Sequence, residues 1–89
     1  MIVVSYDIAD DKLRSRFSKM LTKNGAVRLQ YSVYELVNTK RVVDNLVLKI
    51  DAFSKYFTAA DSVVVFDVSK ENIKKYGNAI HRDQDVVYL

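Results

Sequence analysis

The sequence predicts an α+β fold in which two helices pack on one face of an antiparallel β-sheet. Two stretches carry apolar residues at helical spacing, and apolar, β-branched stretches stand before, between and after them. The order of elements along the chain is therefore β-α-β-β-α-β. With 89 residues, 49% of them hydrophobic, the chain has the length of one domain and enough apolar side chains for a core. We expect a single domain over residues 1–89.

The first strand and the first helix have clear boundaries in the sequence. Residues 2–8 are apolar and mostly β-branched, which is typical of a buried strand. Asp10 and Asp11 then supply an N-cap and favourable negative charge at a helix start. Asn24 and Gly25 are typical of a helix C-terminus. The apolar stripe between these ends consists of Leu13, Phe17, Met20 and Leu21.

Residues 27–37 alternate between apolar and polar side chains, as in a strand with one buried face. No glycine, asparagine or proline marks a turn within this stretch. One strand of this length would nevertheless be long for so small a domain. We therefore expect two shorter strands with a break near Tyr31.

A second amphipathic helix follows, capped by Asn38 or Thr39. Its apolar residues recur at helical spacing, and they are Val42, Val43, Leu46, Val47, Ile50, Phe53 and Phe57. Residues 61–68 predict another hydrophobic strand, which ends near Asp67. A short helical turn is expected from Ser69, stopping at Gly77.

This order of elements is the split βαβ arrangement of the ferredoxin-like fold. A further short strand at residues 85–89 has no place in that four-stranded plan, so we expect it to extend a sheet edge. A chain this short also buries a thin core, which a second subunit would supplement. We therefore predict a two-fold homodimer in which residues 85–89 add to the sheet of the partner subunit.

Composition excludes several classes of function. The chain has no cysteine, which excludes disulfides, thiolate chemistry and most structural zinc sites. Fourteen Lys and Arg against eleven Asp and Glu give a net charge of +3, which is compatible with nucleic acid but does not identify it. The N-terminus lacks the features of a signal peptide, and no apolar run is long enough to span a membrane. We expect a cytoplasmic protein with no membrane partner.

Four segments carry a resemblance to a known family. They are residues 5–8 (Ser-Tyr-Asp-Ile), residues 24–35, residues 61–66 and residues 75–77 (Lys-Tyr-Gly). The most specific part is residues 30–35, Gln-Tyr-Ser-Val-Tyr-Glu. These motifs resemble those of the CRISPR-associated Cas2 family of small spacer-acquisition proteins, in the same order and over nearly the whole chain. The same family includes proteins described as endoribonucleases.

The resemblance implies a dimeric scaffold that binds duplex DNA and bridges copies of the CRISPR integrase partner, of the Cas-one type, during spacer integration. It also implies a Mg²⁺-dependent endonuclease, a phosphodiester hydrolase acting on DNA or RNA. Asp7 aligns with the metal-binding aspartate of the family, which makes it the expected catalytic residue and metal ligand. Because one carboxylate holds Mg²⁺ poorly, Asp7 from each protomer is expected to share one ion.

From the residues alone, two interpretations of Asp7 stay open. A carboxylate that ends a buried strand is costly unless it is paired, hydrogen-bonded or bound to a cation. The first interpretation is therefore a cation ligand, and the second is a residue that caps a helix or braces a loop. Asp10 and Asp11 are expected to be caps.

Basic residues on the first helix are the candidate nucleic-acid contacts. Arg14, Arg16, Lys19 and Lys23 lie on this helix, and Arg28 follows in the second strand. A row of cations suits the closely spaced phosphates of a duplex and carries affinity without sequence information. The alternative is the ordinary solvated side of an amphipathic helix. Tyr31 and Tyr34 are able to stack on bases, although tyrosines in strands more often fill a sheet face.

Two other functional classes remain open at this point. One is a toxin-type endoribonuclease of related fold that acts on cellular RNA, for which growth arrest on expression would be the signature. The other is a dimerisation module that binds no nucleic acid even at low salt. A neighbouring integrase gene and a repeat array would decide for the CRISPR interpretation.

Overall fold

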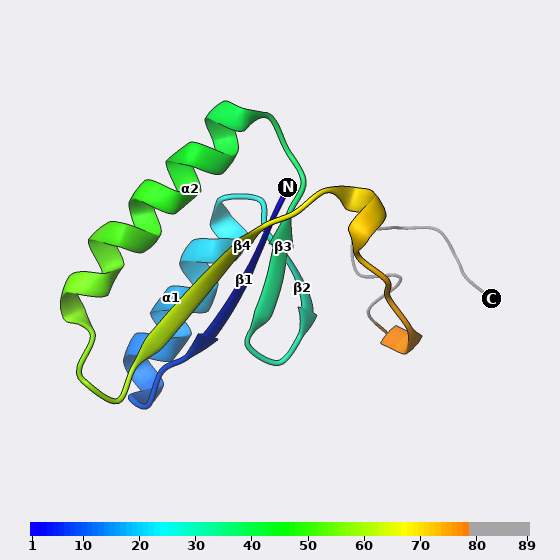
Figure 1. Cartoon of the computed structure of the whole chain (residues 1–89). Helices are drawn as coiled ribbons and strands as arrows, with labels where there is room; N and C mark the ends of the chain where they lie inside the picture. Colours follow the sequence, from blue (N-terminus) through cyan, green and yellow to red (C-terminus); the bar gives the residue numbers. More distant parts are fainter. Residues whose placement is uncertain (79–89) are drawn as a thin grey trace.

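The computed structural model describes residues 1–78, which form a sheet with both helices on one side (Figure 1). The strands are β1 (Ile2–Asp7), β2 (Val27–Gln30), β3 (Val33–Leu36) and β4 (Ser62–Asp67). The helices are α1 (Asp11–Lys23) and α2 (Lys40–Phe53), with short 3₁₀ turns at Ser54–Tyr56 and Lys70–Asn72. The predicted strand at residues 85–89, and with it the predicted exchange between subunits, lies outside the described residues.

The four strands have the spatial order β2-β3-β1-β4, and every neighbouring pair is antiparallel. Two helices on one face of such a sheet give the ferredoxin-like α+β fold, as the sequence predicts. β1 and β3 are central, whereas β2 and β4 form the edges. The fold class is confirmed.

The ends of α1 follow from local hydrogen bonds. The Asp10 carboxylate accepts a hydrogen bond of 2.8 Å from the backbone N–H of Leu13, which satisfies a donor that has no partner within the helix. At the other end Asn24 caps the helix, and Gly25 follows with φ of 93°. This is a backbone conformation that glycine adopts without steric cost. Both predicted ends are correct.

The predicted break near Tyr31 is a tight turn. Gln30 pairs with Val33, so Tyr31 and Ser32 alone connect β2 to β3. Ser32 has φ of 63°, the left-handed conformation that glycine or asparagine more often supplies. The backbone carbonyl of Ser32 accepts a hydrogen bond of 3.0 Å from the N–H of Tyr6, which ties the turn to β1.

The core lies between the sheet and the helices. Alternate residues of β1 face this side, where Val4 is fully buried and Tyr6 is nearly so. Phe17 of α1 lies at the centre of the core, with ring centroids 4.8 Å from Tyr6 and 5.4 Å from Phe53 in edge-to-face geometry. Leu46 and Ile50 of α2 complete the buried stripe.

Two details of the second half differ from the sequence expectation. Phe57 lies beyond the end of α2, so the predicted helix is too long. Its side chain nevertheless packs against the core, as the predicted apolar stripe requires. Val47 stays 39% exposed, because it lies at the margin of the buried stripe. Within the stretch from Ser69 to Gly77, where a helical turn was predicted, a 3₁₀ turn covers Lys70–Asn72.

The sheet face away from the helices is called the open face and carries Val3, Ser5 and Asp7 of β1. Glu35 pairs with Val3 and so lies on the same face. The segment after β4 runs along this side of the sheet (Figure 1), and its Lys75 Nζ lies 2.7 Å from Oε2 of Glu35. This ion pair attaches residues 69–78 to the sheet.

Candidate nucleic-acid interface

Asp7 ends β1 on the open face, opposite Ser62 of β4. Its side chain is exposed to solvent. The strand that it ends is central in the sheet, but the desolvation cost that the sequence suggested for this carboxylate does not arise. Its accessibility is what a ligand for an external cation needs.

Other aspartates brace the loops around the end of β1. The Asp61 carboxylate accepts hydrogen bonds from the backbone N–H of Ala9 (2.9 Å) and of Thr58 (2.8 Å), and so joins the β1–α1 loop to the α2–β4 loop. The hydrogen bond from Thr58, followed by the one from Ala9, lowers the pKa of the Asp61 carboxylate below its ordinary value. The role that the sequence left open for Asp7, loop bracing, is therefore filled by Asp61.

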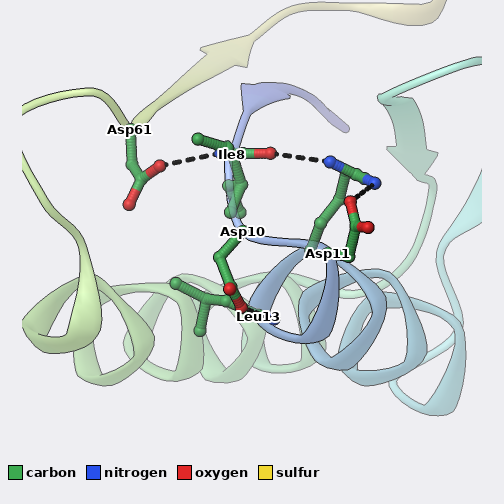
Figure 2. Close-up of polar contacts among 7 residues, drawn as sticks. Ile8, Asp10, Asp11, Leu13 and Asp61 are labelled. Atoms are coloured by element: carbon green, nitrogen blue, oxygen red, sulfur yellow. Dashed lines mark hydrogen bonds and ion pairs between the residues drawn. The ribbon is translucent and has the colours of Figure 1, made fainter.

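Figure 2 shows Asp61 on one side of the chain at Ile8 and Asp11 on the other. Arg14 donates to the Ile8 carbonyl at 3.1 Å and pairs with Asp11. Asp10 caps α1, as predicted. Asp11 instead pairs with Arg14. Asp11 lies in the first turn of α1, where its negative charge interacts favourably with the helix dipole.

Residues 1–78 do not form a complete metal site by themselves. Among residues 1–78, no group of three or more His, Cys, Asp and Glu side chains is arranged to hold a metal ion. Asp61 is occupied by backbone donors, so the exposed Asp7 carboxylate is the group near this strand end that fits a hard cation. Asp7 therefore fits as one ligand of an ion, whose remaining ligands would come from outside residues 1–78.

The predicted basic residues separate into two groups on either side of α1. Arg16, Lys19 and Lys23 line a groove between α1 and α2, together with Lys49 of α2. Met20 is the apolar residue among those that line this groove. We call Arg16, Lys19, Lys23 and Lys49 the basic row. Four cations on adjacent helices provide a surface for a phosphate backbone.

Arg14 and Arg28 belong to a separate cleft between α1 and the β2–β3 hairpin. Arg14 is engaged there by Asp11 and by the Ile8 carbonyl. The guanidinium of Arg28 lies 5.0 Å from the ring centroid of Tyr31, in cation–π geometry. The sequence grouped these two arginines with the basic row, whereas the structure places them in this second cleft.

Lys49 belongs to the basic row, although the sequence did not predict it. Its Nζ donates a hydrogen bond of 2.8 Å to the side-chain carbonyl of Asn24, which holds it beside the C-terminal end of α1. Lys49 is 25 residues from Asn24 in the chain. Only the contact between the two helices brings it to the row, so no local pattern marks it.

β4 is an edge strand with an apolar surface. Val64 and Phe66 are each 49% exposed, and Val65 is 37% exposed. In the described part of the chain β4 has β1 on one side and no strand on the other. Such an edge offers unpaired backbone groups to another strand.

Together, the fold and these surfaces define a small ferredoxin-like domain with a basic helical side and an apolar strand edge. The model of the family described as CRISPR associated protein Cas2 matches residues 1–76. The chain therefore belongs to the Cas2 family and has a CRISPR-associated role, as the motifs indicated. No curated protein matches the sequence. Within residues 1–78, neither helix is long and apolar enough to cross a membrane.

Proposed function

We propose that this protein is a dimeric adaptor of spacer acquisition, which binds the backbone of duplex DNA and bridges copies of the CRISPR integrase. The observation that carries the proposal is the basic row, in a chain of the Cas2 family. The row joins residues of two helices into one cationic surface. The family match favours this function over a toxin-type endoribonuclease with cellular RNA as its target.

The chemistry of the basic row suits duplex DNA without sequence preference. Lysine and arginine side chains on a solvated surface neutralise phosphates and release counterions, so the affinity falls steeply with salt. Such contacts position a protein on DNA but do not read its bases. This is the binding mode that an adaptor for varied spacer sequences needs.

The apolar edge of β4 supports the dimer. An exposed strand edge with half-exposed Val64 and Phe66 gains backbone hydrogen bonds and buried area when another strand is added. The short apolar segment at residues 85–89 of a second copy has the composition for this role. A two-fold dimer then presents two basic rows to one duplex.

A metal-dependent endonuclease activity is the second candidate, and the exposure of Asp7 favours it. In a two-fold dimer, Asp7 of each protomer would contribute one carboxylate to a shared Mg²⁺, with water and substrate oxygens as further ligands. The ion would polarise a phosphodiester or activate a water molecule. Asp7 holds the ion in this scheme, and the basic row holds the nucleic acid, either DNA or RNA.

The adaptor proposal is tested with a pair of variants that carry the same net charge. Lys19→Ala/Lys23→Ala removes half of the basic row, whereas Lys70→Ala/Lys74→Ala removes two exposed lysines from the segment after β4. Both lower the net charge from +3 to +1, since each removes two lysines. Duplex affinity is measured against salt, and a pull-down measures capture of the integrase.

The first variant is expected to weaken binding to all duplex sequences and to lower the salt slope by about two, one for each lost phosphate contact. The second variant should bind like the wild type. An affinity that depends on base sequence but hardly on salt would contradict the proposed contacts. Failure to capture the integrase with or without DNA would contradict the adaptor role.

A further inference from the structure

The cleft between α1 and the β2–β3 hairpin has a composition different from that of the basic row. It has a volume of about 180 Å³, and the residues that line it include Arg14, Ser15, Ser18, Arg28, Tyr31 and Ser32. Hydroxyl groups and guanidinium groups dominate this lining. The cleft is therefore polar and small, whereas the groove between the helices is lined by lysines, Arg16, Asn24 and the apolar Met20.

Tyr31 stands at the tip of the hairpin with 82% of its surface exposed. This is the largest exposure of any large hydrophobic side chain in residues 1–78. The two-residue turn fixes its position, since Ser32 adopts a left-handed conformation and is bonded to β1. The Arg28 guanidinium lies over one face of the ring at 5.0 Å. A ring this exposed keeps its other face open to a planar ligand.

The charges of the cleft are unequal. Arg14 is paired with Asp11 and also donates to a backbone carbonyl. Arg28 has no carboxylate partner among residues 1–78. One guanidinium without a counter-ion thus lies beside an open aromatic face and several hydroxyls. Phosphates bind guanidinium groups strongly, and bases of every kind stack on aromatic rings.

We propose that this cleft binds one unpaired nucleotide, with its base stacked on Tyr31 and its phosphate held by Arg28 and the neighbouring hydroxyls. The inference rests on the proposed nucleic-acid function and adds a substrate class to it. Bases inside a duplex stack on each other and present only their edges, so a duplex cannot use the open ring. The nucleotide is the frayed or single-stranded part of a bound DNA, or part of an RNA.

The chain contains no tryptophan, so a single introduced tryptophan reports on one position. Tyr31→Trp keeps an aromatic platform in the cleft. Tyr76→Trp is the control, because Tyr76 is 78% exposed and lies in the segment after β4. The probes are a short single-stranded oligonucleotide in deoxyribose and ribose forms, an abasic oligomer of equal length and a blunt-ended duplex.

Single strands are expected to quench the fluorescence of Tyr31→Trp, whereas the abasic oligomer and the duplex do not. Tyr76→Trp should stay unchanged with every probe. Quenching by only one of the two sugar forms also supports the site and identifies the nucleic acid that it takes. Equal quenching by the abasic oligomer or by the duplex would overturn the assignment of a stacked base.

A pair of substitutions separates stacking from folding. Tyr31→Ala should weaken single-strand binding by about 5- to 150-fold, which is the range that loss of one stacked base produces. Tyr31→Phe should bind like the wild type, because it keeps the ring. Duplex affinity should be equal in all three proteins, since the basic row is intact.

The inference and the proposed function fail in different ways. If the duplex binds but single strands neither bind nor quench, the unpaired-nucleotide site is wrong and the adaptor proposal stands. If single strands bind, as measured by anisotropy, without quenching Tyr31→Trp, the site is likewise wrong. If no probe binds at low salt, both proposals are wrong.

Discussion

Asp7 differs from its acidic neighbours in what surrounds its carboxylate. Asp10 and Asp61 accept backbone hydrogen bonds, and Asp11 pairs with Arg14, whereas no ion pair within residues 1–78 engages Asp7. An exposed carboxylate without a partner contributes little to folding. The Asp7 carboxylate is therefore available to bind a ligand.

Asp7→Asn is expected to keep the fold and duplex binding, and to lose any Mg²⁺-stimulated cleavage. Asparagine keeps the size of the side chain but removes the negative charge that a hard cation prefers. In the proposed dimer, where the two Asp7 side chains face each other across the two-fold axis, removing these like charges should leave the dimer at least as stable. A nuclease time course with Mg²⁺, Mn²⁺ or EDTA measures the effect, and the mutant should match the EDTA level.

The matched control for Asp7 is Asp67→Asn, which alters an exposed carboxylate at the end of β4. It should cleave like the wild type. Equal cleavage by the wild type and Asp7→Asn would point to another site or to a contaminant. If no preparation cleaves, the adaptor function stands without a nuclease.

Tyr6 gives the molecule a defined response to alkaline pH. Burial, followed by the influence of the adjacent Tyr34, raises the pKa of Tyr6 to about 12. The native state therefore keeps this proton at a pH where the unfolded chain, with a pKa near 10, has released it. The stabilisation is complete below about pH 10 and is lost as the pH rises towards 12.

Between about pH 10 and 12, unfolding of the wild type releases up to about one proton from Tyr6, so its free energy of unfolding falls as the pH rises. Tyr6→Phe lacks this proton, and its free energy of unfolding should fall less steeply over the same range. Denaturant titrations at several pH values measure the slope. Tyr56→Phe is the control, since that side chain is 72% exposed. Identical slopes for Tyr6→Phe and the wild type would show that the buried hydroxyl does not control alkaline unfolding.

The ends of helices and strands can be predicted from the sequence wherever the residue at each end has a type that favours that end. The ends of α1 were predictable because Asp10, Asn24 and Gly25 each favour one helix terminus. The β2–β3 turn was only inferred from strand length, since Ser32 supplies a left-handed conformation that its residue type does not announce. Sequence patterns locate such turns poorly when neither glycine nor asparagine is present.

The candidate interfaces were less predictable than the elements, for a physical reason. Helical spacing places Arg16, Lys19 and Lys23 on one face, but it says nothing of Lys49, which arrives through the contact between α1 and α2. The pairing of Glu35 with Lys75 spans 40 residues and depends on the path of the chain after β4. Long-range contacts of this kind leave no periodic signal in the sequence.

The Glu35–Lys75 ion pair stabilises the segment after β4. The Glu35 side chain is 2% exposed, and its Oε1 has no hydrogen-bond partner among residues 1–78. Lys75→Met would leave this buried carboxylate without a counter-charge. We expect the free energy of unfolding to fall by about 3 kcal/mol, the lower end for such losses, since 23% of the Lys75 side chain is exposed.

Chemical denaturation measures this loss, with Lys74→Met as the exposed control beside it. The double variant Glu35→Leu/Lys75→Met should recover most of the stability, because it removes the uncompensated charge as well as the pair. A single variant as stable as the wild type would show that the pair does not hold residues 69–78 to the sheet.

At the scale of the whole molecule, the chain has two unlike sides. The helix side carries the basic row, and the sheet side carries the half-exposed Val64 and Phe66 near Asp7. Cations repel a second copy of the same surface, whereas apolar strand edges attract one. In the proposed dimer, association through the sheet side would leave the basic rows of both protomers free for DNA.

Deleting residues 85–89 tests this arrangement, and we expect the truncated chain to sediment as a monomer or to aggregate. Without the added strand, β4 keeps an unpaired edge, and the apolar surface of Val64 and Phe66 stays in water. Phe66→Lys should likewise dissociate the dimer of the full chain, because it places a charge on the open face beside that edge. Leu48→Lys, on the helix side at 65% exposure, should leave the dimer intact. A truncated chain that remains a stable dimer would contradict exchange of the terminal strand, and a dimer that also survives Phe66→Lys would place the interface on another surface.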